Sequence, residues 1–278
     1  MSAASPIKVA LITGASSGMG KETAKRFLQE GLIVYVAARR LEQMEDLRTL
    51  GAIPLKMDIT VEEDVIAGVK KIQAGHGGID VLVNNADFGM YSAMEESSIA
   101  DARYQFEVNL FGMARLTQLA LPEMRKKGFG TIINISSMGG KIYTPLGSWY
   151  HATKHAVEGW SDCLRIELAP FGIHVVIIEP GVIATEWGKI LLEPMLKRSG
   201  NGPYQNLTQS MAKAMRSSNE KKGAASPPSV VVDAIVKAVR QHRLNTRYGM
   251  GKMAKRLLFI RKYFGDRFFD MAIMSQAK

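Results

Sequence analysis

Two residues with acid–base chemistry, Tyr150 and Lys154, lie four positions apart in the stretch Trp149 to Ala169. The apolar spacing of this stretch predicts a helix, which would put both side chains on one face with their Cβ atoms about 5–6 Å apart. A free phenol has a pKa of about 10, and a fixed ammonium nearby would lower that pKa by stabilising the phenolate. The pair could therefore exchange a proton with a substrate, although the same spacing also occurs on ordinary solvated helices. Ser137 precedes the tyrosine by thirteen residues and is a further candidate.

A glycine-rich turn near the N-terminus indicates a place for a dinucleotide. The apolar run Lys8 to Thr13 predicts a strand, the turn occupies Gly14 to Gly20, and Glu22 to Glu30 has a helical composition. Glycines let the backbone approach a pyrophosphate closely, and the helix start offers free N–H groups to it. The spacing is Gly-x-x-x-Gly-x-Gly and not the commoner Gly-x-Gly-x-x-Gly, so the turn by itself is also compatible with an ordinary loop.

The end of the second predicted strand, Ile33 to Ala38, bears on the choice of cofactor. An acidic residue there would hold the ribose hydroxyls of NAD, whereas an arginine accommodates the extra phosphate of NADP. The chain has Ala38 followed by Arg39 and Arg40, which favours NADP. The alternative is a solvated basic pair that opens a helix over Leu41 to Leu50.

Strands and helices alternate along most of the chain, which predicts a parallel sheet covered on both faces. The remaining strands are expected at Ile53 to Lys56, Val81 to Val83, Gly130 to Ser136, His174 to Glu179 and Arg247 to Gly249. Helices are expected at Val61 to Gly75, with Thr60 and Glu63 as a capping box, from Ser97 or Ser98 through Asn109 towards Lys127, and at Val230 to Gln241.

Composition fits one globular domain over residues 1–278, with 46% apolar and 22% charged residues. The single cysteine, Cys163, excludes an internal disulfide framework and a thiol metal cluster, and no metal is expected. No run approaches the ~20 apolar residues of a membrane span, so we expect a cytoplasmic protein. The net charge of +10 comes without a nucleic-acid-binding motif, so we expect no nucleic-acid partner.

Two segments depart from the regular alternation. Residues 183–228 lose periodicity and predict a lid-like insertion of loop and helix. Residues 251–278 form a C-terminal extension in which Met253 to Met274 mixes apolar and basic side chains. We expect this extension to pack on the lid or on a neighbouring subunit, with a peripheral membrane-surface helix as the alternative.

Taken together, the ordered motifs resemble the classical short-chain dehydrogenase/reductase family over about residues 6 to 250. They are Thr13-Gly14-x3-Gly18-x-Gly20, Asp58, Asn84-Asn85-Ala86, Asn109, Ser137, Tyr150-x3-Lys154 and Pro180-Gly181-x3-Thr185. The resemblance implies an α/β fold, a single doubly wound Rossmann-type domain with a seven-stranded parallel sheet. It also implies a homodimer or homotetramer, for which the apolar stretch Leu116 to Leu121 is a candidate contact.

The resemblance further implies a catalytic set of Asn109, Ser137, Tyr150 and Lys154. Tyr150 would exchange the proton with the substrate oxygen, Ser137 would orient that oxygen, and Lys154 would hold the nicotinamide ribose and lower the tyrosine pKa. Asn109 would anchor a water in a proton relay or mend a kinked helix. The implied cofactor-binding residues are Gly14, Ser16, Ser17, Gly18, Met19, Gly20, Arg39, Asp58, Ile59, Asn85, Ala86, Tyr150, Lys154, Pro180, Gly181, Val182 and Thr185.

One residue departs from the family pattern, because Asp87 stands where the family usually has glycine. It would place a carboxylate close to the cofactor or the substrate.

The expected function is NADP(H)-dependent interconversion of a carbonyl and a secondary alcohol. A non-catalytic NADP-binding regulator and a dehydratase or epimerase are the alternatives. Large apolar residues expected above the nicotinamide favour a steroid-, retinoid- or lipid-like substrate. They are Phe88, Met90, Tyr91, Met138, Tyr143, Trp187, Leu191 and Met195.

Overall fold

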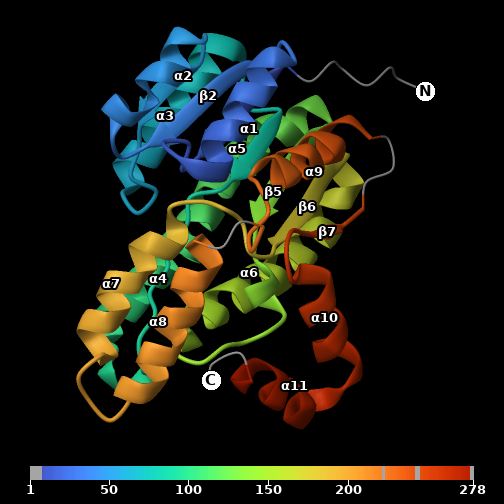
Figure 1. Cartoon of the computed structure of the whole chain (residues 1–278). Helices are drawn as coiled ribbons and strands as arrows, with labels where there is room; N and C mark the ends of the chain where they lie inside the picture. The colour runs from blue at the N-terminus through green and yellow to red at the C-terminus, as the bar shows by residue number, and fades with distance from the viewer. Residues whose placement is uncertain (1–7, 221–222, 242–244, 276–278) are drawn as a thin grey trace.

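The computed structural model describes residues 8–220, 223–241 and 245–275 of the chain. Seven strands form one sheet in the order β3-β2-β1-β4-β5-β6-β7, and every neighbouring pair is parallel (Figure 1). The strands are β1 (Val9–Thr13), β2 (Ile33–Ala38), β3 (Ile53–Lys56), β4 (Val81–Asn84), β5 (Gly130–Ile135), β6 (Ile173–Pro180) and β7 (Arg247–Met250). The predicted fold class is confirmed, as are the positions of the strands to within about one residue.

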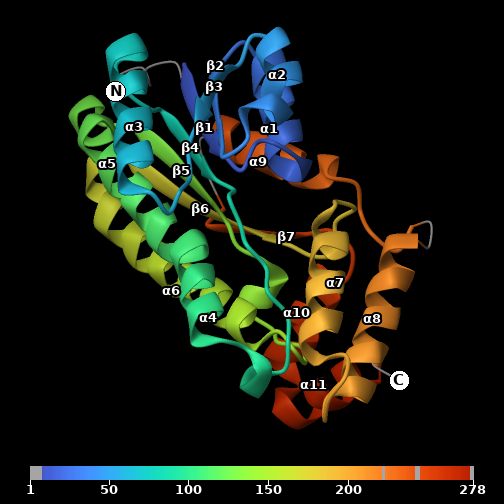
Figure 2. The same ribbon diagram turned by 90° about the vertical axis from the view of Figure 1, so that its left-hand side faces the viewer.

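Helices cover both faces of the sheet, which Figure 2 shows nearly edge-on. One layer contains α1 (Gly18–Gln29), η1 (Leu41–Met44), α2 (Glu45–Thr49) and α9 (Ser229–Arg240), and the other contains α3 (Glu62–His76), α5 (Met113–Lys127) and α6 (Ser148–Leu168). Within β1, Ala10 and Ile12 join the first apolar cluster, whereas Val9 and Leu11 join the second. Successive residues of a strand point to opposite faces of the sheet. A strand that contributes to an apolar core on each face must therefore be apolar at every position.

The strand order reverses between β1 and β4, which are neighbours although two strands separate them along the chain. In doubly wound sheets, ligands bind outside the carboxyl ends of the strands at this reversal. Here the glycine turn follows β1, and Asn85 to Asp87 follow β4. The fold therefore brings the two motifs to one edge of the sheet.

Two helix starts test the capping predictions. The capping box at Thr60 is wrong, because α3 begins after Val61 and the Thr60 hydroxyl donates to Asp58 Oδ1 at 2.8 Å instead. Helix α4 (Ile99–Phe106) begins after Ser98, whose hydroxyl oxygen accepts from the backbone N–H of Asp101 at 3.0 Å, as predicted. A short polar side chain can satisfy nearby backbone or side-chain groups alike, and the sequence does not say which.

The helix expected from Ser98 towards Lys127 is not continuous. A π-helical segment, η3 (Glu107–Gly112), separates α4 from α5. At its end, a Cβ on Gly112 would lie 2.4 Å from the carbonyl oxygen of Ile59, so only glycine allows this close approach of backbones. Such single-turn π-bulges are frequent at functional sites, and this one contains Asn109.

The segments outside the alternating core form two helical hairpins. One is α7 (Trp187–Ser199) with α8 (Gln205–Glu220), and the other is α10 (Ala254–Tyr263) with α11 (Gly265–Met274). Both lie beyond the carboxyl edge of the sheet (Figure 2). Within the described ranges, no helix has the length and apolar character needed to cross a membrane. The structure also contains three short one-turn helices: η2 (Met94–Glu96), η4 (Met138–Gly140) and η5 (Ala169–Phe171).

Candidate active site

The glycine turn after β1 is held in a conformation that side chains would block. Gly14 has a φ of +63° and Gly18 a φ of +54°, values that favour glycine. A Cβ on Gly20 would lie 2.4 Å from Asn85 Nδ2 and 2.7 Å from the Gly14 carbonyl oxygen. The three glycines therefore fit a backbone that doubles back tightly on itself.

Thr13 and Asn85 tie this turn to the loop after β4. The Thr13 hydroxyl oxygen accepts from the backbone N–H groups of Asn85 and Ala86, each at 3.0 Å. In return, Asn85 Nδ2 donates to the Thr13 carbonyl at 2.9 Å and to the Gly14 carbonyl at 3.2 Å. Asn85 is thus a brace for the turn, and its side-chain amide is used within the protein.

The start of α1 remains open to an anion. Ser17 precedes the helix with extended backbone, and its side chain makes no capping hydrogen bond. Ser17 is exposed, and Ser16 and Met19 are half-buried. The first N–H groups of a helix need an acceptor from outside the helix. The turn, its glycines and this uncapped start fit a bound pyrophosphate.

The loop after β6 closes over the same turn. A Cβ on Gly18 would lie 3.5 Å from Thr185 Cγ2, so Thr185 lies beside the turn. Gly181 and Val182 are held by backbone bonds to Met250 and Lys252 at 2.8 and 2.9 Å. The predicted residues from Pro180 to Thr185 are therefore brought to the glycine turn, although their motif lies far along the chain.

The residues expected around the adenosine lie at the ends of β2 and β3. Arg39 is exposed, and its Nη1 donates to the Tyr104 hydroxyl on α4 at 3.1 Å. Asp58 is half-buried and accepts from the backbone N–H of Thr60 at 3.0 Å. Ile59 is buried against α5 and η3. Arg39 thus points along the carboxyl edge of the sheet, towards the β4 loop that Tyr104 contacts through Phe88.

Tyr150 and Lys154 lie one turn apart on α6, and both are buried. Tyr150 is 6% exposed and Lys154 only 1%. Lys154 Nζ lies 5.7 Å from the centre of the Tyr150 ring and donates to the Ile135 carbonyl at 3.1 Å. A buried ammonium needs a countercharge, and Lys154 finds it in Asp87 Oδ1 at 3.1 Å. The residue that departs from the family pattern is therefore the ion-pair partner of the lysine.

The structure corrects the expected effect of Lys154 on the tyrosine. Burial raises the pKa of the Tyr150 phenol well above its usual value, and the charges of Asp87 and Tyr91 raise it further. The Ser137 hydroxyl acts in the opposite direction on this pKa. Asp87, the ion-pair partner of Lys154, thus acts on this pKa in the direction opposite to the one expected of the lysine.

A buried histidine holds the loop that presents Ser137. His151 Nε2 accepts from the backbone N–H of Thr144 at 3.0 Å, so the proton lies on Nδ1, which donates to the Gly139 carbonyl at 2.9 Å. Burial lowers the pKa of His151, in keeping with a neutral ring. Ser137 itself accepts from the backbone N–H of Gly139 at 3.0 Å. His151 therefore fixes the segment after β5 against the start of α6.

Asn109 is fully buried in η3 and uses both ends of its amide. Its Oδ1 accepts from the backbone N–H of Phe88 at 2.8 Å, and its Nδ2 donates to the Phe88 carbonyl at 2.9 Å and to Thr153 Oγ1 at 3.1 Å. These bonds join the π-helical segment to the β4 loop and to α6. Asn109 was expected to anchor a water or to mend a kinked helix, and its observed bonds instead join neighbouring segments.

An apolar cluster closes over Tyr150 from the α7–α8 hairpin. The centre of the Trp187 ring lies 5.2 Å from that of Tyr150 and 6.2 Å from that of Tyr91, and a Cβ on Gly89 would lie 2.8 Å from Leu191. Of the large residues expected near a substrate, Tyr91, Trp187, Leu191 and Met195 belong to this cluster. Met138 and Tyr143 instead pack with α10 and α11, and Phe88 packs on Tyr104. Met90 is buried, with its backbone N–H bonded to Gln105.

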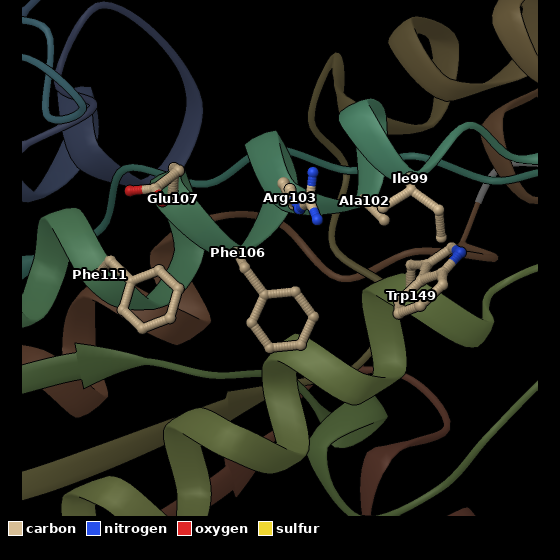
Figure 3. Close-up of a pocket in the computed structure, with 7 residues that line it drawn as sticks. All are labelled: Ile99, Ala102, Arg103, Phe106, Glu107, Phe111 and Trp149. Carbon is tan, nitrogen blue, oxygen red and sulfur yellow. The ribbon is translucent and has the colours of Figure 1, made fainter.

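A separate pocket of about 210 Å³ opens on the outer side of α4 and α6 (Figure 3). It is lined by Ile99, Ala102, Arg103, Phe106, Glu107, Phe111 and Trp149.

The expected contact stretch Leu116 to Leu121 lies mostly in the protein's own core, with Leu116 fully buried. Exposed apolar side chains on this side come from Ile99 and Phe111.

Sequence reasoning missed three roles in the site. It did not single out Thr153 as a partner of Asn109 or His151 as the brace of the Ser137 loop, although both lie inside the Tyr150–Lys154 stretch. It noted Asp87 without its partner. These three residues are polar and lie near the candidate tyrosine in the sequence or the site, which was the one signal that could have identified them. Their hydrogen-bond and ion-pair partners come from segments that only the fold brings close.

Comparison with known proteins agrees with this geometry. The family model for short chain dehydrogenase matches residues 8–194. An uncharacterized oxidoreductase of Bacillus subtilis, YusZ, is 36% identical over 267 residues, covering 92% of this chain and 94% of the relative. The NADPH-dependent 3-dehydrocapnine reductase of Ornithobacterium rhinotracheale is 37% identical over 210 residues, 72% of each chain. A solved short-chain dehydrogenase from Streptomyces avermitilis superposes with a TM-score of 0.79 at 31% identity, covering 97% of this chain and 94% of the other. With a turn, a sheet order and a Tyr–Lys pair of this kind, the chain belongs to the short-chain dehydrogenase/reductase family of oxidoreductases.

Proposed function

We propose that this protein is an NADP(H)-dependent oxidoreductase that interconverts a carbonyl and a secondary alcohol on a hydrophobic substrate. The observation that carries the proposal is a buried Tyr150 that lies between Lys154 and an apolar cluster. A phenol at this position can donate its proton to a carbonyl oxygen as a general acid.

Each residue of the site has a defined task in this proposal. When bound, the nicotinamide supplies the hydride for reduction or accepts it for oxidation. Tyr150 donates its proton to the carbonyl oxygen, and Ser137 donates a hydrogen bond that orients the same oxygen. Lys154 binds the ribose hydroxyls, and Asn109 keeps the β4 loop and α6 in register. The apolar cluster excludes water from the reacting atoms.

The preference for NADP over NAD rests on Arg39. It is exposed at the end of β2, and Ala38 before it supplies no carboxylate for ribose hydroxyls. A guanidinium contact to the 2′-phosphate is charge-assisted and worth roughly 1.5–3 kcal/mol. The NADPH-dependent relative supports the same choice. With Arg39, we assign Gly14, Ser16, Ser17, Gly18, Met19, Gly20, Asp58, Ile59, Asn85, Ala86, Tyr150, Lys154, Pro180, Gly181, Val182 and Thr185 to the cofactor site.

The substrate class follows from the side chains that cover Tyr150. Tyr91, Leu191 and Met195 are buried and Trp187 is half-buried, so a substrate that opened this cluster would meet an apolar surface. Such a surface binds an apolar body and cannot pair with a carboxylate or phosphate. A steroid-, retinoid- or lipid-like ketone or aldehyde fits these walls.

A panel of carbonyl compounds tests the proposal directly. Steroids, fatty aldehydes, aromatic ketones and small polar ketones would be mixed with the protein and NADPH, and NADPH absorbance followed. We expect turnover of the apolar compounds only. NADPH binding without turnover of any compound would favour the non-catalytic regulator. Conversion of substrate with no net loss of NADPH would favour a dehydratase or epimerase.

We also infer a homodimer or homotetramer, formed through the face that carries the pocket in Figure 3. Ile99 is 55% and Phe111 53% exposed there, although both are large and apolar. Covering them removes apolar surface from water. Light scattering at micromolar concentration should show more than one copy, and Phe111→Glu should shift the mass towards the monomer.

A further inference from the structure

The C-terminal hairpin, α10 with α11, has two different faces. Leu257, Phe269 and Ile273 are buried against Ile142 from the loop that follows Ser137. The sequence favoured packing on the lid or on a neighbouring subunit, whereas this inner face packs on the segment that follows Ser137. The outer face has a different composition.

Aromatic side chains dominate the outer face. Phe259, Tyr263, Phe264 and Phe268 are between 43% and 62% exposed. Their rings form one cluster, with centroid distances of 4.8 Å for Phe259 and Tyr263, 6.1 Å for Phe259 and Phe264, and 4.9 Å for Phe264 and Phe268. Met271 is 65% exposed and lies three residues beyond Phe268, on the same side of α11. A contiguous apolar patch of this kind marks an interaction surface.

Basic residues surround this aromatic patch. Lys255, Arg256, Lys262 and Arg267 are exposed, and among residues 8–220, 223–241 and 245–275 none of the four has a carboxylate within ion-pair distance. Lys262 Nζ lies 5.2 Å from the Tyr263 ring centre. The two acidic residues of the hairpin are already engaged, Asp266 with Arg261 and Asp270 with the Tyr143 hydroxyl. Arg261 balances Asp266, and Asp270 keeps its negative charge because a phenol does not neutralise a carboxylate, so the exposed charge of the hairpin is a net excess of positive charge.

We propose that the aromatic patch and its basic border form a docking surface for an anionic lipid bilayer. Aromatic rings that enter the interface with lysine and arginine at the headgroup level are the signature of a helix lying on a membrane. Anionic headgroups supply the charge that the border lacks. The surface would hold the protein on the bilayer without spanning it.

Charge argues against a second copy of this chain as the occupant. A two-fold contact through this face would bring two sets of unpaired basic side chains together. Like charges in close contact destabilise such an interface. The face with Ile99 and Phe111 remains separate and available for subunit contact.

The position of the hairpin gives the docking a consequence for the enzyme. Its inner face packs on Met138, Ile142 and Tyr143, in the segment that follows Ser137. Docking would therefore bring the substrate side of the molecule to the bilayer. The inference does not depend on the substrate class proposed above, because vesicle binding is measured without any substrate.

The test is sedimentation of the full-length protein with vesicles of phosphatidylcholine alone or mixed with phosphatidylglycerol. We expect binding to the mixed vesicles, much weaker binding to the neutral ones, and release in 1 M salt, where the Debye length is about 3 Å. Phe264→Ser with Phe268→Ser should weaken binding at least about tenfold, because less apolar area enters the interface. Lys255→Gln, Arg256→Gln and Lys262→Gln together should weaken it by a similar factor.

Matched variants separate this surface from general positive charge. Lys56→Gln, Lys70→Gln and Lys71→Gln remove three exposed charges elsewhere, and Leu50→Ser removes an exposed apolar side chain directly after α2. These variants should keep vesicle binding near the wild-type level. Equal loss in both basic triples, or no binding to mixed vesicles at low salt, would overturn the proposal. A change in oligomer mass on Phe264→Ser with Phe268→Ser, with vesicle binding intact, would assign the patch to a second copy instead.

Discussion

The cofactor side of the site consists mainly of backbone groups, whereas the substrate side consists mainly of apolar side chains. Around the glycine turn, the site is lined mainly by backbone groups. The side chains of Thr13 and Asn85 hold the carbonyls and N–H groups of this turn in place. Above Tyr150, the α7–α8 hairpin contributes apolar side chains such as Trp187, which pack without specific hydrogen bonds. A backbone site tolerates almost no added atom, whereas an apolar cluster can repack. The first therefore suits one invariant ligand, and the second suits specificity that changes with a few side chains.

The largest effect is expected where the two sides meet, at Tyr150. Tyr150→Phe removes the exchangeable proton and little volume, so carbonyl reduction should fall at least about a hundredfold, within the range of general acid–base catalysis. NADPH affinity, followed by fluorescence titration, should be nearly unchanged. Normal turnover by Tyr150→Phe would end the assignment of this residue as the acid.

On the cofactor side, Gly20→Ala should weaken NADPH binding at least about tenfold. The added methyl would lie 2.4 Å from Asn85 Nδ2, so the turn must shift, and overpacking of this kind also costs about 1–3 kcal/mol of stability. Fluorescence titration measures the binding, and thermal unfolding measures the stability.

Gly159→Ala is the control for that experiment, because an added Cβ in this part of α6 meets nothing within 4 Å. It should leave NADPH binding unchanged and raise stability by up to about 1 kcal/mol through better helix propensity. Equal binding by both alanine variants would mean that the turn is less constrained than its geometry indicates.

The choice between cofactors should depend on Arg39. We expect a preference of at least about tenfold in kcat/KM for NADPH over NADH, from the charge-assisted contact to the 2′-phosphate. Arg39→Ala combined with Ala38→Asp should narrow or reverse it. The preference should also shrink as salt rises, because an exposed contact is screened. Equal use of both cofactors by the wild type at low salt would show that Arg39 serves only its bond to Tyr104.

On the substrate side, Trp187→Ala should raise KM for an apolar carbonyl severalfold and leave NADPH binding alone. The indole is half-buried against Tyr150 and Tyr91, and its removal takes apolar surface away from any molecule held there. Ile190→Ala is the matched control, because Ile190 lies on the same helix but is 63% exposed. Loss of NADPH affinity in Trp187→Ala would contradict the separation of the two sides.

The smallest change concerns pH and the Asp87–Lys154 pair. A group with a raised pKa stays protonated until the pH rises through that pKa, so reduction by wild type should decline only in strongly alkaline solution. Asp87→Asn removes one cause of the rise, and the alkaline limb of the kcat profile should move to lower pH. Oxidation of the alcohol needs the phenolate, so it should begin at lower pH in the variant. Unmoved profiles in both directions would show that Asp87 acts only as a structural partner of Lys154.

Much of the fold could be predicted because its signals are local. The strands β1 to β6 lie where apolar runs do, whereas β7 (Arg247–Met250) has a mixed composition. The capping box at Thr60 failed because Asp58 competes for the same hydroxyl. A kink at Asn109 was one of the expectations, but its π-helical form was not, because a π-helical turn keeps a helical composition while changing only the hydrogen-bond spacing.

The sequence by itself determined where the functional motifs lie along the strands and helices. The glycine turn follows the first strand, Asn85 follows the fourth, and Tyr150 and Lys154 lie one helical turn apart. These are short-range relations, set by strand and helix periodicity. Only the tertiary structure decided that Asp87 neutralises Lys154, that Trp187 covers Tyr150, and that the C-terminal hairpin turns its aromatic residues outward. Those outcomes depend on which segments the sheet order brings together and on how much water they exclude. The same packing raises the pKa of the Tyr150 phenol, although the sequence led us to expect a lowered pKa.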